Sequence, residues 1–179
     1  MPGEISMVGT EETVFSDLYE AHYPDLVRYA RSFAAEPEAA RDMVQEAFLR
    51  LWRRRATLDE NRSVRSLLYT AVRNLVLNEK RDVVLHRDLI KGMKKAEAPP
   101  TPEELTNAAL IGEKMREWIK EFPDRRREAF ELSRFYGLSY KEIASIMGIA
   151  PKTVENHIQL ALKALQEKLR NYDPQLMNS

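Results

Sequence analysis

A group of polar side chains follows Pro151 closely along the chain. Its members differ in their hydrogen-bonding groups: Lys152, Thr153, Glu155, Asn156 and His157. An asparagine amide can pair with both edge groups of adenine, a lysine can donate to guanine, and a carboxylate can accept from the amino group of cytosine. These residue types therefore have the chemistry needed to read base edges, if they lie at the exposed start of one helix. Glu155 fits a second role equally well, in which it only orients a neighbouring side chain.

The residues before this group carry the signals of two successive helices. Ser139 and Glu142 have the S-x-x-E spacing of a capping box, which begins a helix. Gly148 can adopt the left-handed conformation that ends it, and Pro151 suits the first turn of the next helix. Two helices joined by a tight turn predict a helix-turn-helix whose second helix enters the DNA major groove. A helical hairpin with a merely solvated polar face is the alternative.

Basic residues near this predicted motif are candidates for contacts with DNA phosphates. They are Arg125, Arg126, Arg127 and Lys163. Such contacts would add affinity and salt dependence but no sequence information. One position departs from the usual pattern, because Ala150 stands where a serine or threonine would cap the recognition helix.

The bulk composition narrows the class of protein. The chain has 179 residues, with 28 basic and 28 acidic side chains, which argues against non-specific coating of nucleic acid. The absence of cysteine excludes disulfides and thiolate metal sites. No apolar run approaches the roughly 20 residues of a membrane span, and the polar N-terminus does not resemble a signal peptide. We expect a cytoplasmic protein that does not insert into a membrane.

Apolar residues recur at helical spacing along most of the chain, which predicts an all-α fold. The predicted helices cover residues 13–34, 37–55, 63–82, 102–121, 124–136, 139–147 and 151–171.

The helical pattern fails between residues 83 and 101. This segment contains Gly92, a small lysine cluster and a run of prolines, all typical of a linker. We therefore expect two small helical domains joined by a flexible linker. The expected organisation is a tail over 1–12, a helical bundle over 13–82, a linker over 83–101, a helix-turn-helix domain over 102–172 and a tail over 173–179.

Residues 123–169, PDRRREAFELSRFYGLSYKEIASIMGIAPKTVENHIQLALKALQEKL, resemble region four of sigma factors. Taken alone, they also resemble the DNA-binding domain of LuxR-type regulators, which share the T-V-x-N-H turn. The segments FSDLYEAHYPDLVRYARSFAAEPEAARDMVQEAFLRLW and SVRSLLYTAVRNLVLNEKRD resemble region two of extracytoplasmic-function sigma factors. The order of the two regions is also that of this group of the sigma-70 family.

The resemblance implies a surface that binds the core of bacterial RNA polymerase. In the family, the helix carrying D-x-V-Q-E-x-F-x-x-x-W binds the clamp helices of the largest polymerase subunit. Here Asp42, Gln45, Glu46 and Leu49 would lie on one strip of that helix. A solvated face with one exposed leucine is the alternative.

The resemblance also implies that the next helix and the loop over 57–63 recognise and open the minus-ten element. The loop would receive a base flipped out of the duplex, and the helix would hold the separated strand. Leu67 stands where the family often has tryptophan, which leaves Tyr69 as the nearest aromatic residue. Tyr69 suits a core position with a solvated hydroxyl equally well. The candidate contacts are Asn61, Arg62, Arg65, Tyr69, Arg73, Asn74, Asn78, Lys80 and Arg81.

No catalytic motif is present, and His22, His86 and His157 lack the spacing of metal ligands. We therefore expect no enzyme activity, cofactor, metal or small-molecule substrate. The resemblance implies three partners, namely RNA polymerase core, promoter DNA and an anti-sigma factor. Zero net charge favours weak binding to promoters in the absence of the polymerase.

Two alternatives remain at this point. A stand-alone LuxR-type regulator would need a receiver or ligand-binding domain, and residues 1–82 lack the alternating strand and helix pattern of a receiver. A pure interaction module would use both helical domains to bind proteins.

Overall fold

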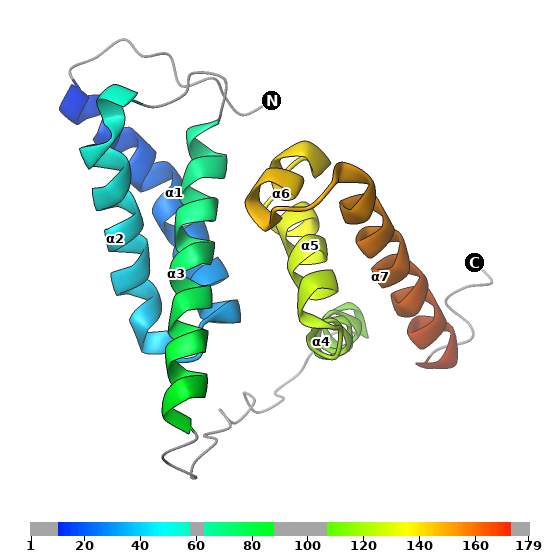
Figure 1. Cartoon of the computed structure of the whole chain (residues 1–179). Coiled ribbons are helices and arrows are strands. Elements are labelled where there is room, and N and C mark those ends of the chain that lie inside the picture. Colours follow the sequence, from blue (N-terminus) through cyan, green and yellow to red (C-terminus); the bar gives the residue numbers. More distant parts are fainter. Residues whose placement is uncertain (1–10, 58–62, 88–106, 173–179) are drawn as a thin grey trace. The chain divides into compact units, whose positions relative to one another are not determined.

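The computed structural model describes residues 11–57, 63–87 and 107–172, and Figure 1 shows the course of the chain. Within these ranges the chain forms seven α-helices and two short 3-10 helices, without a β-strand. The all-α prediction is therefore confirmed for the described residues. No described helix combines the length and apolar character needed to span a bilayer. The contacts divide the chain into two units, Met1–Gly92 and Met93–Ser179.

The first unit is a bundle of three helices that pack on one another. They are α1 (Glu11–Phe33), α2 (Ala40–Arg53) and α3 (Val64–Arg87), with short helices η1 (Pro37–Ala39) and η2 (Arg55–Thr57) on either side of α2. Each helix contributes apolar residues at helical spacing to one core. The fully buried members include Leu26, Ala30, Val44, Ala47, Leu68 and Val72.

Aromatic rings fill one end of this bundle, between the start of α1 and the end of α2. The ring of Phe15 lies edge-on to Trp52, with 4.8 Å between centroids, and 5.8 Å from Phe48. Tyr19 also contacts Phe48 at 4.8 Å. Such edge-to-face pairs add to the energy of burial and fix the orientation of the rings.

A side chain of α3 holds the turn at the opposite end of the bundle. The backbone N–H of Ala35 donates a hydrogen bond of 2.7 Å to Oε2 of Glu79. Ala35 lies in the turn between α1 and α2, so this bond joins the turn to α3.

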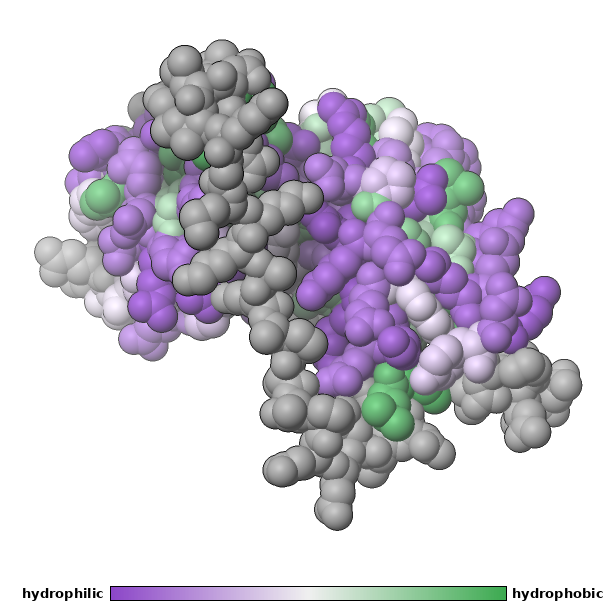
Figure 2. All heavy atoms as spheres, turned by 90° about the horizontal axis from the view of Figure 1, so that it is seen from below, coloured by the Kyte–Doolittle hydropathy of each residue, from purple (hydrophilic) through white to green (hydrophobic). Residues whose placement is uncertain are grey.

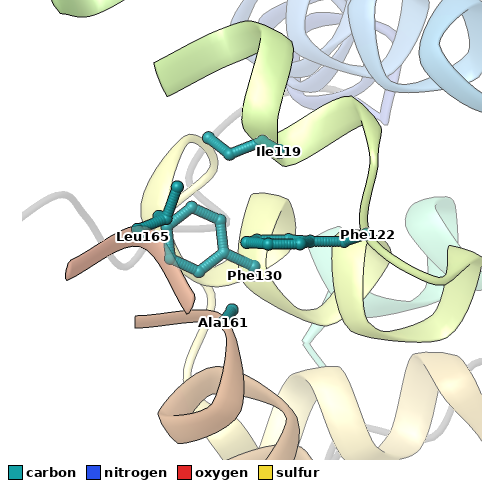
Figure 3. Packing of buried hydrophobic residues seen from close by; sticks show 5 residues of the cluster. All are labelled: Ile119, Phe122, Phe130, Ala161 and Leu165. Atoms are coloured by element: carbon teal, nitrogen blue, oxygen red, sulfur yellow. The ribbon is translucent and has the colours of Figure 1, made fainter. Parts of the chain in front are cut away.

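The second unit packs three helices around the longest one. They are α4 (Asn107–Lys120), α5 (Asp124–Arg134) and α6 (Tyr140–Met147), and all contact α7 (Pro151–Tyr172). A core cluster joins α4, α5 and α7, and Figure 3 shows its side chains pointing toward one another. The cluster consists of Ile119, Phe122, Phe130, Ala161 and Leu165.

Several predicted helix ends are corrected by the structure. The predicted helix 37–55 divides into η1, α2 and η2. At both ends of α2 the backbone N–H groups donate to carbonyl groups three residues earlier, which is the tighter 3-10 pattern. Helix α3 continues to Arg87, so the predicted linker start at residue 83 lies inside a helix. The predicted start of α4 at residue 102, most of the linker and most of both predicted tails lie outside the described residues.

Candidate nucleic-acid and protein interfaces

Helix α6 begins with the predicted capping box. The backbone N–H of Glu142 donates to Oγ of Ser139 at 3.3 Å, and the backbone N–H of Ser139 donates to Oε2 of Glu142 at 2.9 Å. The helix ends at Gly148, whose φ of 64° is left-handed. The predicted helix-turn-helix is therefore present, with α7 as its second helix.

A main-chain carbonyl group accepts the first hydrogen bonds of α7. The carbonyl oxygen of Ala150 accepts hydrogen bonds from the backbone N–H groups of Thr153, at 2.9 Å, and Val154, at 3.2 Å. Pro151 has no N–H to satisfy. The helix thus begins at the predicted residue although Ala150 lacks a capping side chain.

The candidate base-reading residues lie on the outer side of α7. Lys152, Thr153 and Asn156 are exposed, whereas Glu155 and His157 are half-buried. Val154 and Ile158 are buried on the opposite side of the helix. Their burial fixes the rotation of α7 and turns the polar group outward.

Glu155 holds two neighbours along the same helix. Its carboxylate accepts hydrogen bonds from Nζ of Lys152 at 2.8 Å and from Nε2 of Gln159 at 3.0 Å. This geometry agrees with the orienting role that the sequence left open for Glu155. Gln159 is exposed and joins the candidate surface; sequence reasoning missed it, although its spacing of four from Glu155 was a usable signal.

The arginines at the start of α5 lie close to α7. The pKa of His157 is lowered, first by partial burial and then by the charges of Arg126 and Arg125. Arg125 is exposed, while Arg126 and Arg127 are half-buried. Arg125 and Arg126 thus make the surroundings of His157 electropositive, whereas Arg127 pairs with Asp124 at 3.3 Å. The exposed Lys163 lies farther along α7.

Two carboxyl groups of α5 are buried, which the sequence did not predict. Glu128 is 7% exposed and Glu131 is 8% exposed. The pKa of Glu131 is raised to about 7, mainly by burial; the charge of Arg127 opposes the shift, the charge of Glu128 adds to it and Lys120 opposes it. This carboxyl group titrates near neutral pH.

The four predicted polymerase-binding residues share one side of α2. Asp42, Gln45 and Leu49 are exposed, and Leu49 keeps 48% of its surface accessible. Glu46 accepts a 2.7 Å hydrogen bond from Nε of Arg50, which lowers the pKa of its carboxyl group. The strip is thus a polar surface around one accessible leucine.

Most of the candidate contacts on α3 are accessible. Asn74, Asn78 and Arg81 are exposed, and Arg65, Arg73 and Lys80 are half-buried. Asn61 and Arg62, with most of the loop over 57–63, lie outside the described residues.

Tyr69 does not fit the predicted contact with DNA. It is 1% exposed, its hydroxyl oxygen is also buried, and its ring lies 5.3 Å from that of Tyr29 in the core. Arg65 lies over the same ring, with its guanidinium carbon 5.9 Å from the centroid. Tyr69 therefore belongs to the core, without the solvated hydroxyl that the sequence suggested.

The face of the molecule in Figure 2 is mostly hydrophilic in both units, with small separate apolar areas. Such a surface suits polar and charged partners better than a broad apolar one.

Comparisons with known proteins identify the family. The sigma-70 region 2 profile matches residues 18–84, and the sigma-70 region 4 profile matches residues 113–165. The ECF RNA polymerase sigma factor SigL of Mycobacterium tuberculosis is 30% identical over 163 residues, which cover 89% of this chain and 91% of SigL. SigM of Bacillus subtilis is 28% identical over 160 residues, covering 85% and 94% of the two chains. The chain belongs to the ECF RNA polymerase sigma factors.

Solved structures share the fold. The sigma factor RpoE from Bartonella quintana, in complex with the anti-sigma factor NepR, matches with a TM-score of 0.66 and 23% identity, over 87% of this chain and 96% of RpoE. CnrH, in complex with the cytosolic domain of CnrY, matches with a TM-score of 0.61 and 24% identity, over 92% of each chain.

Proposed function

We propose that this chain binds the RNA polymerase core and directs it to a specific set of promoters. The observation that carries the proposal is the pairing of a region 2 bundle with a region 4 helix-turn-helix in one chain. The protein would act by guiding the chemistry of the polymerase, not as an enzyme itself. It would work in the cytoplasm, where the polymerase transcribes.

The start of α7 would read the minus-thirty-five element as duplex DNA. Lys152, Thr153 and Asn156 are exposed there, and each good bidentate contact with a base is worth about 1–3 kcal/mol of discrimination. His157 and the arginines of α5 would face the adjacent phosphates, and Glu155 would orient Lys152.

The first unit would bind the polymerase and the opened minus-ten strand. On α2, Leu49 would fill a pocket of the largest-subunit clamp, within the rim formed by Asp42, Gln45 and Glu46. On α3, the accessible arginines and asparagines would hold the separated strand.

An anti-sigma factor is the third proposed partner. Two relatives of the same fold, RpoE and CnrH, were solved with the anti-sigma factor NepR and with the cytosolic domain of CnrY, respectively. We propose that a protein of this kind covers the polymerase-binding or DNA-binding surface of the chain until a signal releases it.

Reconstituted transcription tests the proposal. Purified protein is mixed with RNA polymerase core and a library of genomic fragments at moderate salt. Transcripts from particular fragments that require both components are expected. If the chain alone bound one duplex as a dimer, and did not bind core, it would be a stand-alone regulator instead.

Two substitutions separate the proposed surfaces. Asn156→Ala is expected to weaken discrimination at one position of the minus-thirty-five element and to leave core binding intact. Gln45→Ala is expected to weaken core binding and to leave the DNA preference of the remaining holoenzyme unchanged. Both side chains are exposed, so neither change should affect folding.

A further inference from the structure

Three consecutive arginines follow Trp52 at the end of α2. All of them, Arg53, Arg54 and Arg55, are exposed, and none belongs to the surfaces proposed above. Basic residues at the end of a helix complement its dipole. That effect needs no particular side-chain geometry. The side chain of Arg55, however, has a defined position.

Arg55 lies on the indole ring of Trp52. Its guanidinium carbon is 4.2 Å from the ring centroid, and its Nη1 donates a 3.0 Å hydrogen bond to the carbonyl oxygen of Trp52. The indole is fixed from α1 by the ring of Phe15, at 4.8 Å. Trp52 is half-buried while Arg55 is exposed, so the pair presents an ordered, positively charged layer at the surface.

Trp52 and Arg55 lie where an opened promoter strand bound to α3 would reach them. Arg55 begins η2, and the chain then passes through the loop over 57–63 to Val64 at the start of α3. Both η2 and the start of α3 lie at the same end of the bundle (Figure 1). A strand held along α3 would therefore reach the pair when it continues past the start of that helix.

Single-stranded nucleic acid binds to such layers. Its bases stack on aromatic rings and on the planes of arginine side chains, while the positive charge attracts the phosphates. We infer that Trp52 and Arg55 form a stacking platform for one unpaired base of the promoter strand, outside the segment read by α3 and its preceding loop. The inference rests on the proposed function, since only an opened promoter supplies the unpaired base.

Holoenzyme reconstituted with full-length variants tests the platform. Promoter fragments carry an unpaired non-template strand with 2-aminopurine at successive positions, and stacking quenches its fluorescence. Arg55→Lys keeps the charge but lacks the planar fork, and Arg55→Gln removes the charge. Arg31→Gln is the matched control, because Arg31 is exposed on α1 and belongs to none of the proposed surfaces.

One labelled position should be quenched in the wild type and recover its fluorescence in both Arg55 variants. Affinity for that fragment should fall roughly tenfold in Arg55→Gln, whereas core binding and binding to fully paired minus-thirty-five DNA stay unchanged. Arg55→Lys should keep the salt dependence of the wild type, and Arg31→Gln should behave as wild type throughout.

Three results would overturn the inference. The first is quenching at the wild-type level in both Arg55 variants. The second is an equal loss of quenching and fragment affinity in Arg31→Gln. The third is a loss of fragment affinity in the Arg55 variants that is matched by their loss of core binding. Wild-type holoenzyme that bound no promoter fragment would overturn the proposed function, and this inference with it.

Discussion

A single buried carboxyl group makes the second unit sensitive to pH. The pKa of Glu131 is raised from an ordinary value of 4.5 to about 7, so folding favours its protonated form. The contribution of Glu131 to the free energy of unfolding is fully present below pH 4.5 and is lost as the pH rises through 7. The linked free energy amounts to about 3 kcal/mol, at 1.36 kcal/mol for each pKa unit.

We therefore expect Glu131→Gln to stabilise the protein at pH 8 and to have little effect at pH 4.5. Urea unfolding of wild type and variant, followed in parallel at both pH values, measures the difference. Equal differences at the two pH values would contradict this account of Glu131.

Residues that depend on contacts between distant segments were the hardest to predict. The sequence left Tyr69 open between a DNA contact and a core position, and its burial against the ring of Tyr29 from α1 places it in the core. Glu128 and Glu131 resemble solvated acids, because acidic residues are rarely buried. The local sequence of a helix does not determine which of its sides will be covered by helices from distant parts of the chain.

At the scale of elements, the turn between α6 and α7 depends on one glycine. Gly148 has a φ of 64°, and a Cβ atom there would meet no other atom within 4 Å. Gly148→Ala should therefore destabilise the second unit by backbone strain alone, by about 1–2 kcal/mol, and weaken binding to minus-thirty-five DNA.

Gly112→Ala provides the matched control. Gly112 lies inside α4, also with nothing within 4 Å of an added Cβ, and its backbone is helical. Alanine should stabilise α4 by roughly 0.5–1 kcal/mol. Thermal unfolding of the two variants should shift in opposite directions, and shifts of the same sign would contradict the conformational explanation.

The proposed polymerase surface of α2 centres on Leu49. An exposed leucine that becomes buried in a complex contributes through its apolar area, so Leu49→Ala should weaken core binding about tenfold without changing thermal stability. Leu110→Ala, at another exposed leucine on α4, should leave core affinity unchanged. Fluorescence anisotropy of labelled protein titrated with core measures both.

Elements with local signals were predicted well. Ser139, Glu142 and Gly148 mark the ends of α6 by spacing and backbone preference alone, and the structure has both ends where these residues place them. The end of α3 was predicted too early, because residues 83–87 carry no strong pattern and the breaking signals begin only at Gly92.

For the whole molecule, the charge balance predicts dependence on the polymerase. Basic and acidic residues number 28 each, so the free chain as a whole has no net electrostatic attraction to DNA beyond that of its local basic surfaces. We expect the isolated protein to bind its promoter at least about 100-fold more weakly than the holoenzyme at physiological salt. Gel-shift titrations with and without core measure this ratio, and equal affinities would contradict the expectation.

The hydrogen bond from Ala35 to Glu79 has a mechanical consequence. It fastens the turn leading into α2 to the side of α3, over a donor–acceptor distance of 2.7 Å. Under the proposed function, α3 carries the pull of the promoter strand and α2 is anchored on the polymerase. Tension in the DNA would then reach the anchored helix through the shared core of the bundle and, at this end, through the carboxylate of Glu79, which ties the turn before α2 to α3.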